Sequence, residues 1–95
     1  MKTLVTGSAG HLGEALVRTL RTRGEDVVGM DVKPSPATDL VGSVADRRRV
    51  EAAMEDVDAV LHAATLHKPH VATHSRQDFV DTNVSGTLAL LEAAQ

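Results

Sequence analysis

The sequence contains no cysteine, no tryptophan and no tyrosine, and phenylalanine occurs once in its 95 residues. Without cysteine no disulfide can form, which excludes the small secreted proteins that depend on a disulfide framework and favours a reducing compartment. The apolar residues make up 42% of the chain, and most of them are valine, alanine and leucine. This composition suits strands that are buried on both faces, with helices of small residues packed on them.

An excess of basic charge and long apolar runs are also missing. The net charge is −3, and a negative chain has no electrostatic attraction for nucleic acid or for an anionic membrane. The basic run Arg47–Arg49 is short and predicts a solvated helix face. No apolar stretch approaches the ~20 residues of a membrane span, and the N-terminus lacks the pattern of a signal peptide. We therefore expect one cytoplasmic domain over residues 1–95, without a nucleic-acid or membrane partner.

The most informative stretch is TGSAGHLG, residues 6–13. It follows an apolar run and opens an amphipathic segment, an order that predicts a strand, a tight turn and a helix. A glycine turn lets backbone N–H groups approach a diphosphate, and the N-terminus of the following helix adds unpaired donors and the positive end of its dipole. We assign the tight turn to Gly7, the close approach to the ligand to Gly10, and the packing of helix on strand to Gly13.

A carboxylate further along the chain supports a dinucleotide as the ligand. Asp31 ends the second apolar run, 18 residues after Gly13. At that spacing a carboxylate can accept a hydrogen bond from the 2′-OH of an adenosine ribose. Glycines alone can simply mark a turn, but the strand–turn–helix context and Asp31 together favour dinucleotide binding.

The rest of the chain continues the alternation of strand and helix. The predicted strands are Lys2–Thr6, Asp26–Asp31, Asp39–Val44 and Val57–Ala63, and the predicted helices are Gly10–Arg23, Asp46–Asp56 and Arg76–Gln95. Alternation of this kind implies right-handed crossovers and a parallel sheet. We therefore predict an α/β fold, an incomplete Rossmann-type parallel sheet with helices on both faces and the strand order 3-2-1-4. The ligand is expected beyond the carboxyl ends of the first and fourth strands.

Two of the predicted helices carry apolar residues at helical spacing. In the first helix these are Leu12, Leu16 and Leu20, and in the last helix they are Val80, Val84, Leu88 and Leu91. We expect each set to form one stripe along its helix. The last helix also contains Gly86, which costs a helix interior about 1 kcal/mol relative to alanine and therefore suggests a tight contact.

The glycines of residues 6–13 are spaced Gly-x-x-Gly-x-x-Gly, and this loop resembles the cofactor loop of the extended short-chain dehydrogenase/reductases. That group contains the nucleotide-sugar epimerases and dehydratases. The segment VLHAA (60–64) resembles the family's fourth strand, and NVSGTL (83–88) followed by LEAA (91–94) resembles its next helix. The resemblance covers nearly the whole chain in the correct order, and it implies the Rossmann-type fold and dinucleotide binding.

The resemblance also implies a cofactor and the residues that hold it. Asp31 would hold the adenosine ribose and favour NAD, because its charge repels a 2′-phosphate, while Lys33 leaves NADP as the less favoured alternative. Ser43 and Val44 stand at the adenine, where the family usually has an acidic residue before an aliphatic one. His11 stands where many members have an aromatic residue, and it either packs over the diphosphate or is a surface histidine. The implied cofactor residues are Gly7, Gly10, His11, Leu12, Gly13, Asp31, Ser43, Val44, Ala63, Ala64, Thr65 and Asn83.

Three histidines, His67, His70 and His74, are spaced like one face of a helix. Three imidazoles can bind zinc, but Pro69 interrupts the set and no cysteine or carboxylate completes a known pattern. We favour a polar loop over a metal site, and we assign no metal ligand. By the resemblance this loop lies near the substrate, so His67, Lys68 and His70 are candidates to touch it.

The family performs its chemistry with a Tyr-x-x-x-Lys pair, and this sequence has no tyrosine. We therefore assign no catalytic residue. We expect the chain to be the N-terminal part of an epimerase/dehydratase-like oxidoreductase, which acts by hydride transfer on a nucleotide-sugar or a related hydroxyl or carbonyl substrate. The alternative is a complete, non-catalytic module that binds or senses a dinucleotide. The resemblance further implies a homodimer formed through the last helix.

Overall fold

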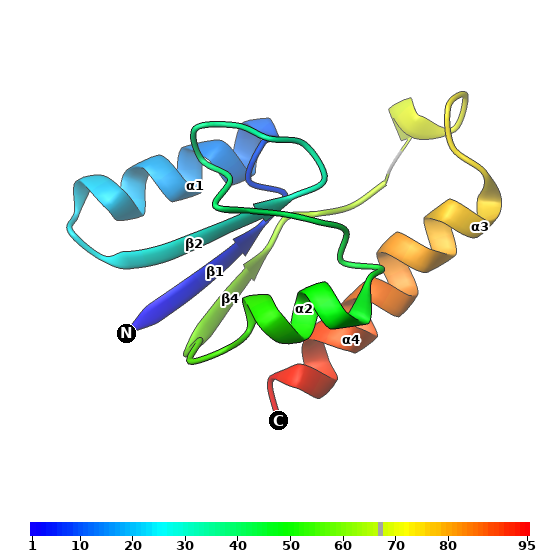
Figure 1. Cartoon of the computed structure of the whole chain (residues 1–95). Coiled ribbons are helices and arrows are strands. Elements are labelled where there is room, and N and C mark those ends of the chain that lie inside the picture. The colour runs from blue at the N-terminus through cyan, green and yellow to red at the C-terminus, as the bar shows by residue number, and fades with distance from the viewer. Residues whose placement is uncertain (67) are drawn as a thin grey trace.

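The computed structural model describes residues 1–66 and 68–95, with every side chain in those ranges except that of Lys68. The strands are β1 (Lys2–Thr6), β2 (Asp26–Asp31), β3 (Leu40–Val41) and β4 (Ala59–His62). The helices are α1 (His11–Thr22), α2 (Arg47–Ala53), α3 (Arg76–Phe79) and α4 (Gly86–Ala93), with a 3-10 turn at Lys68–His70 and a π-helical segment at Val80–Ser85. Helices follow β1, β3 and β4, while β2 runs into β3 through a loop; Figure 1 shows the arrangement of these elements.

The four strands form one parallel sheet in the order β3-β2-β1-β4. This confirms the predicted fold class and strand order. Thr6, the last residue of β1, pairs with Met30 on one side and with His62 on the other. The carboxyl ends of the three longer strands therefore meet at one edge, where a doubly wound sheet binds its ligand.

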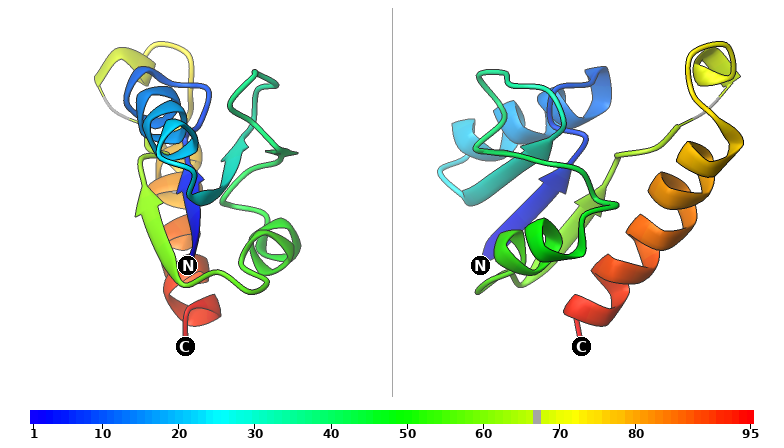
Figure 2. Two further views of the ribbon diagram at one scale, coloured as in Figure 1. Left: turned by 90° about the vertical axis from the view of Figure 1, so that its left-hand side faces the viewer. Right: turned by 45° about the vertical axis from the view of Figure 1, so that its right-hand side comes forward.

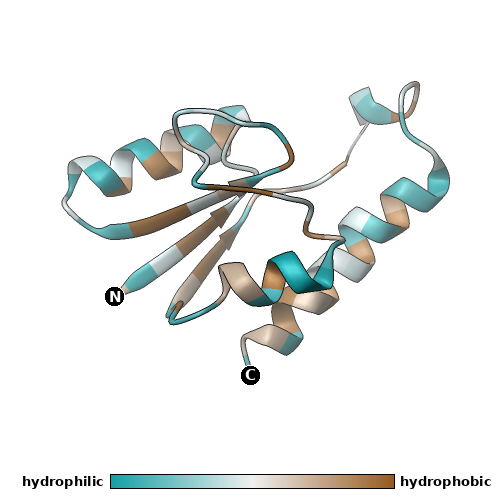
Figure 3. Ribbon diagram, in the orientation of Figure 1, coloured by the Kyte–Doolittle hydropathy of each residue, from teal (hydrophilic) through white to brown (hydrophobic). Residues whose placement is uncertain are grey.

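Helices cover both faces of the sheet, because successive apolar side chains of the central strand β1 point to opposite faces. Leu4 of β1 faces a cluster formed with α2 and α4, which includes Met30, Val50 and Leu90. Val5, the next residue, faces the opposite cluster, where Val17 and Leu16 of α1 pack. Figure 3 shows the apolar residues of β1, β2 and β4 between these layers. A residue period of two thus splits the core into two halves.

Several elements are shorter than the sequence predicts: β4 covers Ala59–His62 in place of Val57–Ala63, and β3 and α2 are also shortened. The third strand has two residues in place of six, because the chain turns away after Val41 and Ser43 accepts a backbone hydrogen bond from Asp46. Asp46 caps α2, and its side chain accepts hydrogen bonds from the N–H groups of Arg48 and Arg49. This helix ends at Ala53, and the chain then reverses through Asp56, whose φ of +60° is left-handed. Local turn chemistry, which periodicity does not report, sets the ends of β3 and α2.

The predicted last helix is present as one continuous rod of three parts. It begins with a capping box between Ser75 and Asp78, and this hydrogen bonding lowers the pKa of the Asp78 carboxyl. The π-helical segment Val80–Ser85 then leads directly into α4, and Figure 2 shows the three parts following one axis. A π-helical stretch is rare and often marks a functional position. Neither this rod nor another helix among the described residues is long and apolar enough to cross a membrane.

The stripe of the first helix is largely in the core, where Leu16 and Leu20 pack, whereas the stripe of the last helix is exposed. Leu12 of α1 is 64% exposed, and Gly13 and Val17 are the buried residues of that helix. Along the stripe of the last helix the exposed fractions are Val80 46%, Val84 62%, Leu88 50% and Leu91 61%. The rod instead packs through its small residues, Gly86 and Ala89, together with Leu90. Small residues allow a close approach to α2, which large ones would prevent.

Gly86 makes the tight contact that its place in a helix suggests. A Cβ built on Gly86 would lie 2.7 Å from Val44 Cγ2 and 3.2 Å from Val44 Cβ. In Gly86→Ala the overlap costs about 1–3 kcal/mol and helix propensity returns about 1 kcal/mol, so we expect a net loss of stability in urea unfolding. Val44→Ala removes the clashing methyl groups, and the double variant should therefore be more stable than the sum of the single effects predicts. Strictly additive effects would show that the two residues do not conflict.

Candidate functional site

The first glycine of the turn is required by two independent features. Gly7 has φ +72°, a left-handed conformation that side chains with a Cβ rarely adopt. A Cβ on Gly7 would also lie 2.8 Å from Ala64 N and 2.9 Å from Ala63 C. The end of β4 is therefore pressed against the turn, which places the backbone of Ala63 and Ala64 beside it.

The other two glycines differ sharply in what surrounds them. A Cβ on Gly13 would lie 1.9 Å from Gly7 O and 2.5 Å from Gly7 C, so no side chain fits between α1 and the turn. At Gly10 the nearest atom to such a Cβ is Gly7 O, at 3.4 Å, and the residue is exposed. Gly13 thus serves helix packing, while the space at Gly10 opens outward. The spacing predicts this packing role for Gly13, and the close approach of a ligand to Gly10 stays a prediction.

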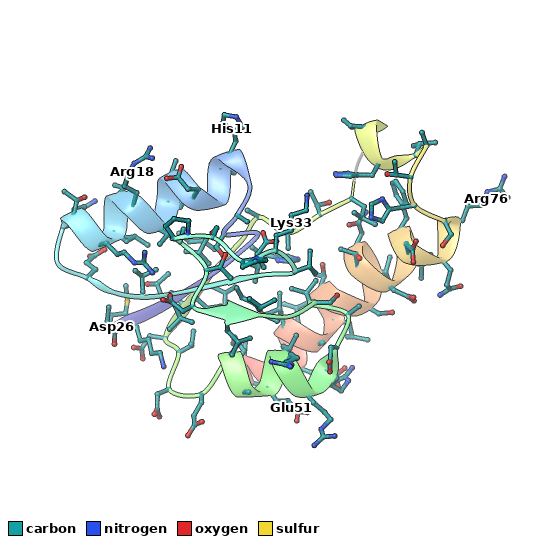
Figure 4. All side chains as sticks on the ribbon, turned by 45° about the horizontal axis from the view of Figure 1, so that its top comes forward. His11, Arg18, Asp26, Lys33, Glu51 and Arg76 are labelled. Atoms are coloured by element: carbon teal, nitrogen blue, oxygen red, sulfur yellow. The ribbon has the colours of Figure 1, made fainter. Side chains whose placement is uncertain are left out.

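The N-terminus of α1 faces the same open side. Gly10 is its N-cap and provides no side-chain cap, so the first-turn N–H groups lack a side-chain acceptor in the part of the chain described. Leu12 and His11 are both exposed there. In Figure 4 the His11 side chain projects outward from the start of α1. The arrangement presents backbone donors and the positive end of a 12-residue helix to an incoming anion.

Asp31 lies directly beside the glycine turn. Its Oδ2 accepts a hydrogen bond from Ala9 N at 2.9 Å, and its Oδ1 accepts one from Lys33 N at 2.9 Å. The carboxylate therefore connects the turn after β1 with the loop after β2. The structure brings together the two sequence features that first indicated a dinucleotide.

Ser43 and Val44 contribute differently from one another. The Ser43 side chain accepts a hydrogen bond from Ala45 N at 3.0 Å, which stabilises the turn before α2. The Val44 side chain is 4% exposed and packs in the core against Gly86. The adenine contacts of both residues stay predictions.

Asn83 holds the loop that follows β4. Its Oδ1 accepts hydrogen bonds from Leu66 N at 2.8 Å and from Thr65 Oγ1 at 3.0 Å, and its Nδ2 donates to Leu66 O at 2.7 Å. The side chain thus satisfies both backbone groups of Leu66. Asn83 belongs to the π-helical segment, and through these bonds the segment fixes residues 65 and 66.

Three further residues belong to the site, although the sequence analysis did not select them. Thr6 Oγ1 lies 2.6 Å from His62 Nδ1, and Thr87 Oγ1 lies 3.1 Å from His62 Nε2. Burial lowers the pKa of His62 below its ordinary value. The available signal was the predicted neighbourhood of the first and fourth strands, because Thr6 and His62 lie at or near their carboxyl ends; in the structure the two residues pair in register.

The histidine cluster is described only in part. The rings of His70 and His74 meet edge to face, with their centroids 5.4 Å apart. His67 and the side chain of Lys68 lie outside the described residues, so their predicted contact with substrate stays a prediction. Within the described residues no group of three histidine, aspartate or glutamate side chains is arranged to hold a metal ion.

The described residues of the site offer hydrogen-bonding groups of the kind that hold a phosphorylated ligand. The site has backbone donors at the turn, one carboxylate at Asp31, and a loop that Asn83 holds in place. The sequence supplies no tyrosine, the residue that would exchange a proton in the resembled family.

A family model and a curated relative both match nearly the whole of this chain. Residues 3–95 match the model of the NAD dependent epimerase/dehydratase family. The chain is 37% identical to the sterol demethylase protein B of Methylococcus capsulatus, an alignment that takes in 100% of this chain and 31% of that protein. The chain spans about a third of the length of the curated relatives that it matches.

Solved structures are similar over nearly the whole chain. A short-chain dehydrogenase/reductase superfamily protein from Agrobacterium tumefaciens, with bound NAD, has a TM-score of 0.88 at 40% identity and covers 99% of this chain and 29% of its own. The UDP-glucose 4-epimerase of Thermus thermophilus, in complex with NAD, has a TM-score of 0.82 at 28% identity and covers 98% and 33%. In both, the matching region is part of a longer chain.

Proposed function

This chain belongs to the NAD-dependent epimerase/dehydratase family, and from that premise we propose that it binds NAD at the glycine turn as the cofactor-binding part of an oxidoreductase. The observation that carries the proposal is the different surroundings of the three glycines. At Gly7 and Gly13, neighbouring protein atoms leave no room for a side chain. Gly10 has that room, and a glycine that faces open space is explained by a ligand that must approach its backbone.

The proposed binding mode assigns each part of the cofactor to a part of the site. The diphosphate lies over Gly10 and the N-terminus of α1, with His11 and Leu12 beside it, where helix and backbone dipoles favour negative charge. Asp31 accepts hydrogen bonds from the adenosine ribose and repels the 2′-phosphate of NADP. Ser43 and Val44 lie toward the adenine. Residues 63–65 and Asn83 line the other side. NAD-bound structures of similar proteins support this mode.

The activity of the whole protein is the second part of the proposal. A bound NAD accepts hydride and, once reduced, donates it, and the similar proteins include a UDP-glucose 4-epimerase and a probable dTDP-glucose 4,6-dehydratase, whose names give nucleotide sugars as substrates. We therefore propose a hydroxyl or carbonyl substrate of that kind, with residues 1–95 as the cofactor domain. The missing tyrosine favours a second candidate for the 95-residue chain by itself, a non-catalytic dinucleotide-binding module. Turnover of a nucleotide sugar by the 95-residue chain with NAD bound would decide against the second candidate.

A homodimer is supported by the exposed stripe of the last helix. Val80, Val84, Leu88 and Leu91 are each 46–62% exposed and follow one another at helical spacing. A continuous apolar stripe of this kind is typical of a protein interface, and pairing it with a second copy would bury it. Sedimentation of the chain, with Val84→Glu as a disrupting variant, tests the dimer. A cytoplasmic location stays a prediction from the sequence.

Calorimetry of NAD and NADP binding tests the proposed cofactor site. In Asp31→Ala we expect NAD to bind roughly ten- to a hundredfold more weakly, because hydrogen bonds to a charged group contribute about 1.5–3 kcal/mol. NADP should lose less affinity or gain some, because the repulsion of its 2′-phosphate is removed. The preference for NAD should therefore shrink in this variant.

The matched control is Asp26→Ala. Asp26 is an exposed carboxylate at the other end of the same strand, so this variant changes the net charge equally without touching the site, and NAD affinity should stay as in the wild type. Equal weakening in both variants would point to a general charge effect. A folded wild-type chain that binds neither dinucleotide would contradict the proposal.

A further inference from the structure

A chain of hydrogen bonds crosses the molecule from the glycine turn to the last helix. Ala64 N donates to Thr6 Oγ1 at 3.1 Å, and Thr6 Oγ1 lies 2.6 Å from His62 Nδ1. On the other side of the ring, Nε2 lies 3.1 Å from Thr87 Oγ1, and Thr87 Oγ1 donates to Asn83 O at 2.8 Å. One imidazole thus connects the end of β1 with the π-helical segment.

The hydroxyl group of Thr87 determines which atoms donate and which accept along this series of hydrogen bonds. A hydroxyl has one proton, and Thr87 uses it toward Asn83 O, which can only accept. Toward the ring, Thr87 Oγ1 can therefore only accept, so Nε2 of His62 carries the proton. In the neutral ring Nδ1 is then bare, and it accepts the proton of the Thr6 hydroxyl. Thr6 Oγ1 keeps a lone pair for Ala64 N.

The consequence reaches the proposed cofactor loop. Thr6 is fully buried, so its hydroxyl can be satisfied only by partners of this kind. Ala64, which it holds, lies against Gly7 so closely that a Cβ there would be 2.8 Å from Ala64 N. Two residues later, Asn83 holds Leu66 by both backbone groups. The loop is therefore fixed from two sides, and His62 joins the two.

We propose that His62, as its Nε2–H tautomer, is a positioning residue that holds the loop 63–66 against the glycine turn and so shapes the cofactor site. It touches no reacting atom in this role and acts through Thr6 and Thr87. The expected effect of His62 on NAD affinity rests on the proposed function. The tautomer of His62 and its effect on the order of the loop are independent of that function.

The test uses Thr87, because replacing His62 also removes the packing of the ring. Thr87→Val keeps the shape and deletes the acceptor, and Thr87→Ser keeps the hydroxyl. In Thr87→Val we expect faster hydrogen exchange of the Ala64 amide and a roughly three- to tenfold loss of NAD affinity, the effect of about one hydrogen bond. In Thr87→Ser both should return to within about twofold of the wild type. A role in stability alone would not move NAD affinity in chains that are equally folded.

Nitrogen NMR of the His62 ring gives a direct readout, because a bare and a protonated ring nitrogen have well-separated shifts. We expect Nδ1 bare and Nε2 protonated in the wild type. The opposite tautomer would overturn the proposal, and so would an unchanged Ala64 exchange rate in Thr87→Val. If the wild type binds no NAD but the tautomer and the Ala64 exchange behave as expected, the cofactor assignment fails and the positioning of the loop stands.

Discussion

Gly13→Ala is expected to abolish NAD binding and to destabilise the fold by more than about 3 kcal/mol. The new Cβ would lie 1.9 Å from Gly7 O and 3.0 Å from Ser8 Cα, and these are backbone atoms that no side-chain rotation can move aside. To relieve the overlap, α1 must lift away from the turn. That movement opens the core around Val17, a residue of α1 whose side chain is fully buried. Urea unfolding and calorimetry with NAD measure the two losses.

Gly10→Ala is the matched control for this prediction. Its Cβ meets only Gly7 O, at 3.4 Å, so the free energy of unfolding should change by less than about 1 kcal/mol. NAD affinity should nevertheless fall at least roughly tenfold, because the methyl group occupies the space assigned to the diphosphate. A variant that keeps full NAD affinity would show that the diphosphate does not approach Gly10. Equal destabilisation by both substitutions would contradict the distinction between packing glycine and ligand glycine.

The pair also shows how far the sequence predicts this site. Spacing alone assigned the turn to Gly7, the ligand to Gly10 and helix packing to Gly13, because the order of strand, turn and helix leaves few alternatives. The contact between Gly7 and Ala64 was beyond reach, since it joins residues 57 positions apart. The predicted fourth strand, Val57–Ala63, also runs one residue past the observed end of β4 at His62, so the prediction did not place Ala64 against the turn.

The last helix shows where periodicity is insufficient. Residues 86–93 are apolar on nearly every side, so the pattern cannot decide which face meets the core. The face with the larger side chains, which includes Leu88 and Leu91, is exposed. The face with Gly86 and Ala89 is buried, because close packing against Val44 needs small residues. Gly86 itself carried the correct signal, since a glycine in a helix interior costs stability and needs a structural reason.

Asn83→Ala is expected to cost about 2–3 kcal/mol of unfolding free energy and at least roughly tenfold in NAD affinity. The substitution removes the two bonds accepted by Oδ1 and the bond donated by Nδ2, and it leaves both backbone groups of Leu66 without their partner. The π-helical segment then no longer holds the loop that follows β4 beside the glycine turn. Urea unfolding and NAD calorimetry measure the losses, and full NAD affinity would show that the order of this loop does not matter for the cofactor.

Asn83→Asp separates the two halves of the Asn83 contact by pH. The carboxylate still accepts from Leu66 N and Thr65 Oγ1, but it places a second oxygen where Nδ2 donates to Leu66 O at 2.7 Å. Repulsion between these oxygens, together with the hydrogen bond that the protonated acid can donate, raises the pKa of the new carboxyl in the folded state. A raised pKa means that the folded state holds its proton more tightly, so the contribution is present at low pH and is lost as pH rises through the folded-state value. Thermal unfolding should therefore show Asn83→Asp approaching the wild type as pH falls toward 4 and falling behind it near pH 7, while Asn83→Ala stays less stable at both. A constant difference between Asn83→Asp and the wild type would mean that Leu66 O does not face the side chain of residue 83 in solution.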